Sequence, residues 1–471
     1  MTNDLPPTQP SQPTPPFNPL SRRSLLVTGA AAIAGMAALP GCASNPVAHA
    51  PAPAPLPQGR PLTGTIRIGV VGCGGRGTGA IVQALRADPD VKLIAMGDVF
   101  QDRLDSCYKN IHEEMGDRAP TAIDVPRERR FVGLDCFKRV LDCDIDLILI
   151  TGYPAFRPEQ LNAAVNAGKH VFAEKPLAVD ATGIRTVKQA ARNAAARGLN
   201  LVVGFCWRYN PGMREAFKHV NGGGLGRVIT AHTCYHTSTL TKRPRRPEWT
   251  DTEFQLRNWW HFTWLSGDHI VEQSIHSVDR LMWATGDRLP EKVICLGGCA
   301  ARTGPESGNS FDHFAALYHY ADGTRAYHTA RQIDGCPSDN TDYIYGTNAW
   351  CEINGWKPTY LTRDYNGNIL WEHKRPKQAD IETAVRDDED MYQVEHNELF
   401  AALRSGKPIN DGERAANACL MGIMARMAAY TGQTVTWQQA LESKENLLPE
   451  HLAMGTLETP KLAIPGKTKL S

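Results

Sequence analysis

The sequence predicts an α/β fold, with an N-terminal parallel sheet and a C-terminal α+β domain that carries an open, mostly antiparallel sheet. Three observations predict it. A short β-branched strand ends in a cluster of glycines at Ile66–Gly77. Apolar strands then alternate with helical segments up to residue 210, and long alternating runs joined by turn residues follow. Strands separated by helices favour parallel pairing, and runs joined by turns favour antiparallel pairing.

Residues 1–42 have the pattern of an export signal. The first twenty residues are rich in Pro, Thr and Gln, and Ser21-Arg22-Arg23-Ser24-Leu25-Leu26 then precedes an Ala- and Gly-rich run that ends at Leu39. That run is about 15 residues long, which is too short for a stable membrane span. Paired arginines before a short apolar run are typical of a twin-arginine signal. The alternative is an ordinary basic tail before a helix.

The residues after the leader predict how it is processed. Leu39-Pro40-Gly41-Cys42 resembles a lipobox, in which Cys42 would be lipidated, and Ala48-His49-Ala50 offers an A-x-A cleavage site instead. Residues 43–64 are predicted to be a Pro/Ala-rich tether of extended polyproline character, so the fold should begin near Thr65. We therefore expect a periplasmic or cell-envelope protein that uses the twin-arginine export machinery. It would meet the membrane only through a lipid anchor at Cys42.

The glycine cluster predicts a dinucleotide site. Gly72, Gly74 and Gly77 have the G-x-G-x-x-G spacing, in the segment Gly72-Cys73-Gly74-Gly75-Arg76-Gly77. The first glycine permits a tight turn, the second lets the backbone approach a pyrophosphate, and the third lets helix and strand pack closely. The helix that follows presents unpaired N–H groups to the phosphates. A glycine turn in an α/β fold that binds no nucleotide is the alternative.

An acid at the end of the second strand specifies the nucleotide. The run Val91–Met96 ends at Gly97-Asp98, about 20 residues after the glycines, where a carboxylate binds the adenosine ribose hydroxyls. Because Asp98 would repel a 2′-phosphate, the pattern favours NAD over NADP. Residues 65–210 are therefore predicted to be a Rossmann-type NAD-binding domain.

The alternation of strands and helices continues through this domain. Strands are expected at Asp146–Ile150, His170–Phe172 and Leu201–Gly204, with helices at about Pro158–Ala167 and Ala181–Arg197 between them. Ligands bind at the carboxyl ends of parallel strands. The residues at those ends are Gly72, Asp98, Thr151 and Lys175, so the candidate site residues should converge.

Residues 211–390 are predicted to form a substrate-binding and oligomerisation domain with an open sheet. Turn residues such as Ala321-Asp322-Gly323 connect its strands. Helices at about Met391–Ser405 and Gly412–Thr431 lie in the segment 391–471, which we expect to pack back on the first domain. An open sheet face often mediates association, so we expect a homo-oligomer. The expected strands are Val228–His236, Val293–Ala300, His313–Tyr320, Arg325–Gln332, Asp342–Gly346 and Ala349–Ile353.

Composition narrows the function classes. The formal net charge is +1, which argues against nucleic acid as a partner, and Pro244 interrupts the Arg-rich stretch Lys242–Arg246, which we expect to be a solvated loop. The twelve cysteines show neither C-x-x-C pairing nor a His/Cys metal spacing. We therefore expect no metal site and mostly reduced cysteines in the core.

Two motifs carry the predicted chemistry. In Glu174-Lys175-Pro176 the proline restrains a lysine at a strand end, where it can bind a substrate hydroxyl and stabilise a developing alkoxide. A plain surface turn is the alternative. From about Asp268 a helix is predicted, with Asp268, Glu272, His276 and Asp279 along one face.

A histidine with carboxylates one turn away can act as a base, because the acids orient the ring and raise its proton affinity. A polar face that points to solvent, opposite an apolar stripe, is the alternative. Metal binding by Asp268, His269, Glu272 and His276 has no spacing that supports it.

In their order along the chain, these motifs resemble the glucose-fructose oxidoreductase/inositol dehydrogenase (Gfo/Idh/MocA) family over nearly all of the chain after the tether. They are the glycine turn, Asp98, Glu-Lys-Pro, Glu272-x-x-x-His276-x-x-Asp279 and Ala428-Ala429-Tyr430-Thr431-Gly432-Gln433. The family often has Asp at the position of Glu272 and Gly at that of Ser274.

The resemblance implies that Lys175 positions a hydroxyl and His276 removes its proton, while hydride passes to the nicotinamide C4. The implied catalytic residues are Lys175, His276, Glu272 and His269. The implied substrate contacts are Tyr153, Arg208, Tyr209, Asp268 and Asp279. The implied cofactor contacts are Gly72, Gly74, Gly75, Arg76, Gly77, Asp98, Thr151, Glu174 and Lys175.

The leader, the Gly-Gly-Arg-Gly turn and the Trp- and His-rich segment before residue 268 also resemble exported members, including glycoside hydrolase family 109. Outside the cytoplasm there is no nicotinamide pool, so such an enzyme should retain its cofactor and restore its redox state. We expect an NAD(P)-dependent oxidoreductase acting on a sugar or glycoside. An NAD-dependent glycosidase, which oxidises, eliminates, hydrates and reduces, is the first alternative, with His269 or Tyr209 as a second acid/base. A non-catalytic sugar-binding protein is the second.

Overall fold

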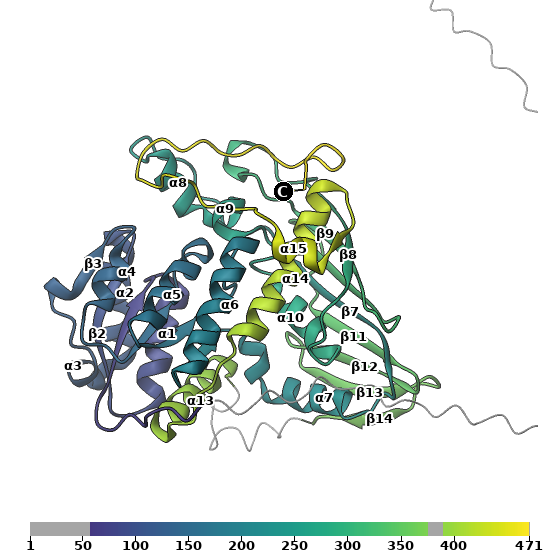
Figure 1. Ribbon diagram of the computed structural model, residues 1–471, viewed down its shortest axis with the longest axis horizontal. Helices are drawn as coiled ribbons and strands as arrows, with labels where there is room; N and C mark the ends of the chain where they lie inside the picture. Colours follow the sequence, from purple (N-terminus) through teal and green to yellow (C-terminus); the bar gives the residue numbers. More distant parts are fainter. Residues whose placement is uncertain (1–56, 375–389, 471) are drawn as a thin grey trace, which may run out of the picture. The chain divides into compact units, whose positions relative to one another are not determined.

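The computed structural model describes residues 57–374 and 390–470, and these form one compact unit (Figure 1). The predicted twin-arginine signal, the lipobox at Cys42, the Ala48-His49-Ala50 site and the first part of the tether lie outside the described residues. Among the helices that are described, none combines the length and the apolar character that crossing a bilayer requires.

The first sheet is parallel throughout, with strand order β3-β2-β1-β4-β5-β6. The order reverses between β1 and β4, and ligands of such sheets bind in the crevice at that switch point. The predicted strands are present, while the three-residue β3 is too short for a recognisable pattern. The strands are β1 (Ile66–Val71), β2 (Val91–Asp98), β3 (Arg130–Val132), β4 (Leu147–Ile150), β5 (His170–Ala173) and β6 (Leu201–Val203).

Helices cover both faces of this sheet, as the alternation of elements predicts. The side chain of Asp180 caps α6 by accepting a hydrogen bond from Gly183 N (2.7 Å). The helices of this part are α1 (Gly75–Ala87), α2 (Gln101–Met115), α3 (Ala119–Ala122), α4 (Cys136–Leu141), α5 (Arg157–Asn166) and α6 (Ala181–Ala196).

The second sheet has strand order β14-β13-β12-β11-β7-β10-β9-β8-β15, and only the β7–β10 pair is parallel. This confirms the predicted α/β chain with an open, mostly antiparallel second sheet. The strands are β7 (Val228–Thr237), β8 (Lys292–Gly298), β9 (His313–His319), β10 (Arg325–Gln332), β11 (Thr341–Gly346), β12 (Ala349–Asn354), β13 (Thr359–Asp364), β14 (Ile369–Glu372) and β15 (Val435–Thr436).

Helices pack on one face of this sheet, and the other face is open. α10 lies against β7 and α14 lies against β8, whereas Ile294, Leu296 and Tyr327 on the open face are exposed. The helices of this part are α7 (Pro211–Asn221), α8 (Asp251–Arg257), α9 (Thr263–Ser266), α10 (Ile275–Ala284), α13 (Met391–Ser405), α14 (Gly412–Thr431) and α15 (Trp437–Glu442).

The C-terminal helices join the two sheets. α13 packs on α1, as predicted, and α14 runs between α6 and the second sheet (Figure 1). Arg426 of α14 is fully buried and donates to the carbonyl oxygens of Val179 (2.6 Å) and Gly267 (3.2 Å). α14 therefore packs against both halves and not only against the first domain.

The end of the predicted tether is part of the fold. Gly59 N donates to Gly406 O (2.9 Å) and Leu62 N donates to Leu403 O (3.0 Å). The last carbonyls of a helix lack partners within the helix, and the extended segment supplies donors for those of α13. Residues 59–62 of the predicted tether therefore pack on α13 as part of the fold, before the predicted start near Thr65.

Candidate active site

A cavity of about 540 Å³ lies between the carboxyl ends of the parallel strands, the segment that leads into α10, and β7. Its size suits a bound small molecule or the reactive half of a dinucleotide. The structure brings many of the predicted residues to this cavity. They are Gly72, Gly74, Gly75, Arg76, Gly77, Asp98, Thr151, Tyr153, Glu174, Lys175, Glu272 and His276.

The three motif glycines occupy the positions that their predicted roles require. Gly72 has φ +99°, a conformation that side chains rarely adopt. A Cβ on Gly77 would lie 1.9 Å from Gly72 O, so only glycine allows α1 to pack this close to β1. A Cβ on Gly74 would meet no atom within 4 Å. The space beside Gly74 is therefore free for a ligand such as a pyrophosphate.

Side chains from neighbouring strands hold the glycine turn in place. Asp98 Oδ2 accepts a hydrogen bond from Cys73 N (2.6 Å), and Thr151 Oγ1 donates to Gly72 O (2.6 Å). Burial raises the pKa of Asp98 above its usual value. Asp98 thus shapes the turn as well as lining the cavity, a role that its position at a strand end did not reveal.

Arg76 links the glycine turn to the Glu-Lys-Pro turn. Its Nε donates to Glu174 Oε1 (2.7 Å), and the Glu174 side chain is only 5% exposed. Behind this pair lies Glu395, which is fully buried and has no hydrogen-bond partner on either carboxyl oxygen. Burial, followed by the charge of Glu174, raises the pKa of Glu395 well above its usual value and so favours the neutral carboxyl.

Lys175 is held at the cavity by two acceptors on one residue. Its Nζ donates to the main-chain oxygen of Glu272 (2.9 Å) and to Glu272 Oε1 (3.0 Å). Arg157, which the sequence analysis missed, braces the turn by donating to Pro176 O (2.7 Å) and Gly152 O (2.6 Å). The ammonium group therefore has a fixed position beside the cavity.

His276 is an unprotonated base. Burial lowers the pKa of His276 well below its usual value, and the charges of Lys175 and Arg280 lower it further. The expectation that neighbouring acids raise its proton affinity is therefore wrong, because Glu272 is paired with Lys175 and Asp279 is paired with Arg208. The imidazole can accept a proton at neutral pH.

The predicted helix from Asp268 does not form as a single helix. α10 begins at Ile275, and the preceding residues make turns in which Ser274 N bonds to His269 O (2.9 Å), five residues back. This wide turn shifts the register, as π-type turns do. Asp268, Glu272, His276 and Asp279 therefore do not share one face.

As a result, Asp268 and His269, predicted to contact substrate and to take part in catalysis, are not among the residues that line the cavity. Asp268 has φ +75° and accepts hydrogen bonds from Phe311 N (2.7 Å) and from the hydroxyl of Tyr430. His269 has its Nδ1 beside Phe311 O (3.2 Å). Both residues tie the turn to the second sheet and to α14.

Arg208, Tyr209 and Asp279, the other predicted substrate contacts, are also not among the residues that line the cavity. Arg208 Nε forms an ion pair with Asp279 Oδ2 (2.8 Å), and Arg414 lies 3.3 Å from the same carboxylate. Tyr209 donates to Asp411 Oδ2 (3.1 Å). These buried charges satisfy one another and join α10 to the start of α14.

Aromatic residues that the sequence analysis did not single out form much of the opposite wall. Tyr235 of β7 donates to Gln273 Oε1 (3.1 Å), and both residues line the cavity. The Trp-rich stretch before α9 was the available signal for part of this wall. The tryptophans that line the cavity are Trp207, Trp259, Trp260 and Trp356.

Several buried polar atoms of the lining residues have no partner within the described protein. Buried polar groups are nearly always hydrogen-bonded, so these atoms mark a place for a polar ligand or for water. They are Arg157 Nε, Gln160 Oε1, Trp260 Nε1, Glu272 Oε2 and His276 Nδ1.

Positive charge gathers near the glycine turn. Arg103 and Arg243 line the cavity and also an adjoining hollow of about 950 Å³ that reaches Gly74 and Gly75. Burial lowers the pKa of Arg243, and the charges of Arg103 and Arg257 lower it further. An anionic ligand would relieve this repulsion. The open space at Gly74, the arginines and the acid at the end of β2 together fit a dinucleotide.

Comparison with known proteins agrees with this geometry. Residues 66–205 match the GFO_IDH_MocA model, described as an oxidoreductase family with an NAD-binding Rossmann fold. The chain is 30% identical over 227 residues to "Inositol 2-dehydrogenase 3" of Saccharopolyspora erythraea, a match that covers 48% of this chain and 55% of that protein. It is 25% identical over 182 residues to "2,7-anhydro-N-acetylneuraminate hydratase" of Escherichia coli, covering 39% and 44%.

The chain therefore spans about half the length of the curated relatives that it matches. Among solved structures, a levoglucosan dehydrogenase in complex with NADH and L-sorbose superposes with a TM-score of 0.62 at 14% identity. That match covers 79% of this chain and 99% of the other. At this identity the likeness concerns the fold.

Proposed function

We propose that this protein is an NAD-dependent oxidoreductase that acts on a hydroxyl of a sugar or glycoside, because residues 66–205 match the Gfo/Idh/MocA oxidoreductase family model with its NAD-binding Rossmann fold. The observation that carries the proposal is the pairing of a fixed ammonium and an unprotonated imidazole in one cavity beside the glycine turn. That pair is what removal of a hydroxyl proton requires.

Each residue has a defined task in this proposal. Lys175 Nζ binds the substrate oxygen and stabilises negative charge on it, while His276 takes the hydroxyl proton. Glu272 holds Lys175 in place through two hydrogen bonds. Bound NAD supplies the hydride acceptor. Asp98 and the turn at Gly74 would hold its ribose and pyrophosphate.

The aromatic wall supports a ring-shaped, polyhydroxylated substrate. Pockets of this kind bind the apolar face of a ligand on aromatic rings and fix its orientation with a few polar groups. The unpartnered atoms of Trp260, Glu272 and His276 are available for hydroxyls. Matched proteins are named for inositol and levoglucosan, both polyhydroxylated rings.

The test uses the purified, cofactor-loaded full chain and a panel of sugars and glycosides. A substrate alone should give the near-ultraviolet absorbance of reduced nicotinamide, and a second sugar that accepts hydride should remove it. No absorbance change with any sugar would favour a non-catalytic sugar-binding protein. Mass spectrometry of the denatured protein identifies the nucleotide and shows whether it is retained.

A redox-assisted glycosidase is the second candidate, favoured by the match to a protein named as a hydratase. Oxidation of a C3 hydroxyl acidifies the C2–H, loss of the aglycone and addition of water follow, and the C3 ketone is then reduced. His269 and Tyr209 lie outside the cavity, so the second acid/base would be Glu272, through its unpartnered Oε2, or Tyr153. Release of nitrophenol from nitrophenyl glycosides without net NADH formation would distinguish this chemistry.

We also propose export by the twin-arginine route, with either a lipid anchor at Cys42 or cleavage after Ala50. The support is the leader pattern around Arg22 and Arg23. Replacing both arginines with lysine should keep the protein in the cytoplasm, and Cys42→Ala should abolish labelling by a radioactive fatty acid if the anchor is correct.

A homo-oligomer formed through the open sheet face is the proposed assembly. Ile294, Leu317 and Tyr327 are aligned in register across β8, β9 and β10, and Leu296 is 73% exposed. A contiguous apolar face of this kind marks an interaction site. Leu296→Glu should shift the protein to a smaller species in light scattering while leaving the cavity intact.

A further inference from the structure

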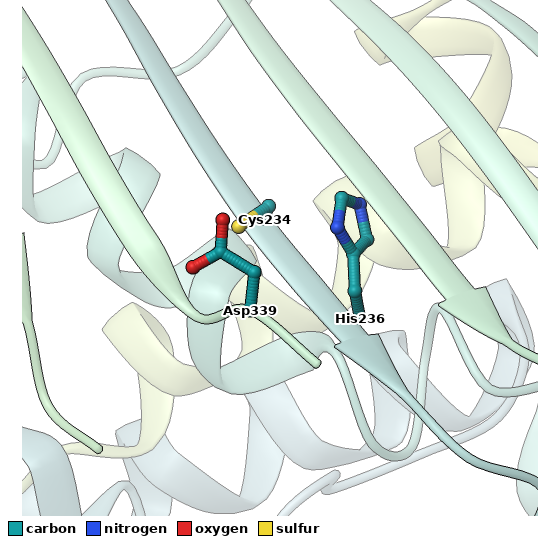
Figure 2. Close-up of side chains that lie close together, drawn as sticks. All are labelled: Cys234, His236 and Asp339. Carbon is teal, nitrogen blue, oxygen red and sulfur yellow. The ribbon is translucent and has the colours of Figure 1, made fainter. Parts of the chain in front are cut away.

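Three potential metal ligands lie together at the carboxyl end of β7 (Figure 2). Cys234 and His236 flank Tyr235 in this strand, and successive side chains of a strand point to opposite faces. Tyr235 lines the cavity, so Cys234 and His236 are on the open face of the sheet. The sequence analysis missed this group because its third member, Asp339, is about a hundred residues away along the chain.

The backbone holds Asp339 next to His236. His236 N donates to Asp339 O (2.8 Å) and Asp339 N donates to His236 O (3.0 Å), a two-bond bridge between β7 and the segment before β11. Figure 2 shows the carboxylate beside the sulfur of Cys234 and the imidazole on the other side. The cluster therefore sits on paired backbone and not on a free loop.

The ligand atoms have the separation and the chemistry of a metal site. One atom from each of the three side chains lies within 4.8 Å of the others. A thiolate sulfur, an imidazole nitrogen and a carboxylate oxygen are the ligands that zinc takes in tetrahedral sites. Cys234 is buried, whereas His236 and Asp339 are half-buried, so a water molecule could complete the set from the solvent side.

Neighbouring hydroxyl groups orient two of the three side chains. His236 Nε2 lies 3.0 Å from Thr329 Oγ1, and Asp339 Oδ1 accepts from Thr341 N (3.0 Å) and Thr341 Oγ1 (2.6 Å). Such outer contacts fix the ring and the carboxylate of metal ligands and leave their other donor atoms for the ion. The threonine contacts use His236 Nε2 and Asp339 Oδ1, so His236 Nδ1 and Asp339 Oδ2 are the atoms left for the ion.

We propose that Cys234, His236 and Asp339 bind a zinc ion on the open face of the second sheet. Binding converts the Cys234 thiol to a thiolate and releases its proton to solvent. The thiolate and the carboxylate then balance the charge of the ion. A metal-free cluster, in which the thiol bonds to Asp339 and to Thr341 O (3.3 Å), is the competing state.

The site would stabilise the strand that carries Tyr235 into the cavity. Because Cys234 and His236 flank Tyr235 in the chain, an ion bound to them on the open face would fix the end of β7. The phenol of Tyr235 would then keep its position beside Gln273. Its role is structural, and it stands apart from the proposed oxidoreductase chemistry.

Metal content tests the proposal directly. The purified full chain is stripped with a chelator, mixed with one equivalent of zinc chloride, passed through a desalting column and measured by elemental analysis. The wild type should retain one zinc per chain. Cys234→Ser and Asp339→Asn should each reduce retention to background. Cys143→Ser, a change at a half-buried thiol in the first domain, is the matched control and should retain one zinc.

Cobalt gives a second readout that identifies the sulfur ligand. Cobalt(II) in the same site should produce a thiolate charge-transfer band, and Cys234→Ser should remove it. Circular dichroism checks that each variant is folded, and Asp339→Asn at a half-buried position serves if the cysteine variant does not fold. Failure of the wild type to retain zinc, or equal zinc retention by the wild type, Cys234→Ser and Asp339→Asn, overturns the proposal.

Discussion

Lys175 and His276 line the same cavity, and the neighbours of His276 lower its pKa. The carboxylate of Glu272 accepts a hydrogen bond from Lys175 Nζ at 3.0 Å through its Oε1. The adjacent ammonium and burial both lower the pKa of His276. The residues therefore form an acceptor of protons next to a stabiliser of negative charge.

Removing either group should slow turnover strongly without loss of cofactor. Lys175→Ala and His276→Asn should each lower kcat by about 10²–10⁴-fold, the usual contribution of a positioned acid or base. Because the pKa of His276 is lowered, kcat/KM of the wild type should show no fall from this residue across the neutral range. Lys92→Ala, at an exposed lysine, is the control for a changed charge. Unchanged kcat in Lys175→Ala would contradict the assigned role.

The raised pKa of Glu395 makes the stability of the fold depend on pH in a defined direction. Its pKa is raised in the folded protein, so the unfolded chain ionises first as pH rises. The contribution of this group is therefore complete below the unfolded pKa and is lost as pH rises through the folded value.

Glu395→Gln should consequently reduce the fall of the unfolding free energy as pH rises, and the variant should be no less stable than the wild type at neutral pH. Denaturant unfolding of both proteins at several pH values measures this. Parallel curves for the two proteins would mean that Glu395 is ionised in the fold.

Among the elements, the β1–α1 turn gives the sharpest contrast between two neighbouring glycines. Gly77→Ala would place a Cβ 1.9 Å from Gly72 O, whereas Gly74→Ala meets no atom within 4 Å. We expect Gly77→Ala to lower the melting temperature strongly, because backbone cannot move aside. Gly74→Ala should keep the fold but weaken NAD binding, since its methyl group occupies the phosphate space. Calorimetry and nucleotide titration of the two variants test this pair.

The sequence predicts the glycine turn and the strand ends more reliably than the segment before α10, for physical reasons. The glycine turn and the strand ends were predictable because Gly72, Asp98 and Thr151 obey local backbone rules. The segment before α10 was not, because the five-residue hydrogen bond at Ser274 breaks the helical period on which the prediction depended. Long-range ion pairs such as Arg208–Asp279 leave no local pattern either.

Considered as a whole, the molecule contains several histidines that are buried in the neutral form. Burial lowers the pKa of His261 to about 4 and that of His396 to about 3. Below the unfolded value of about 6.5, the unfolded chain binds protons at these positions and the folded protein does not. Each histidine should therefore cost about 1.4 kcal/mol of stability per pH unit of acidification over that range.

Chemical denaturation of the wild type and of His396→Gln at several pH values measures how much His396 contributes to this loss of stability. The variant should lose less stability than the wild type as pH falls from the unfolded pKa of histidine toward about 4. Identical acid sensitivity in the two proteins would assign the effect to other groups. Cavity residues are untouched by this change, so nucleotide binding provides a control for the fold.

The packing of α13 on α1, and of Gly59 and Leu62 on its last turn, has a consequence for biosynthesis. A ribosome synthesises residues 66–205 first, yet α13, which packs on α1, emerges only after strands β7 to β14 of the second sheet have been made. The hydrogen bond that Leu201 N donates to Ile409 O at the edge of the first sheet (2.8 Å) also forms only after residue 409 has been synthesised. Gly59 and Leu62 therefore cannot form their hydrogen bonds with Gly406 and Leu403 until α13 has been translated.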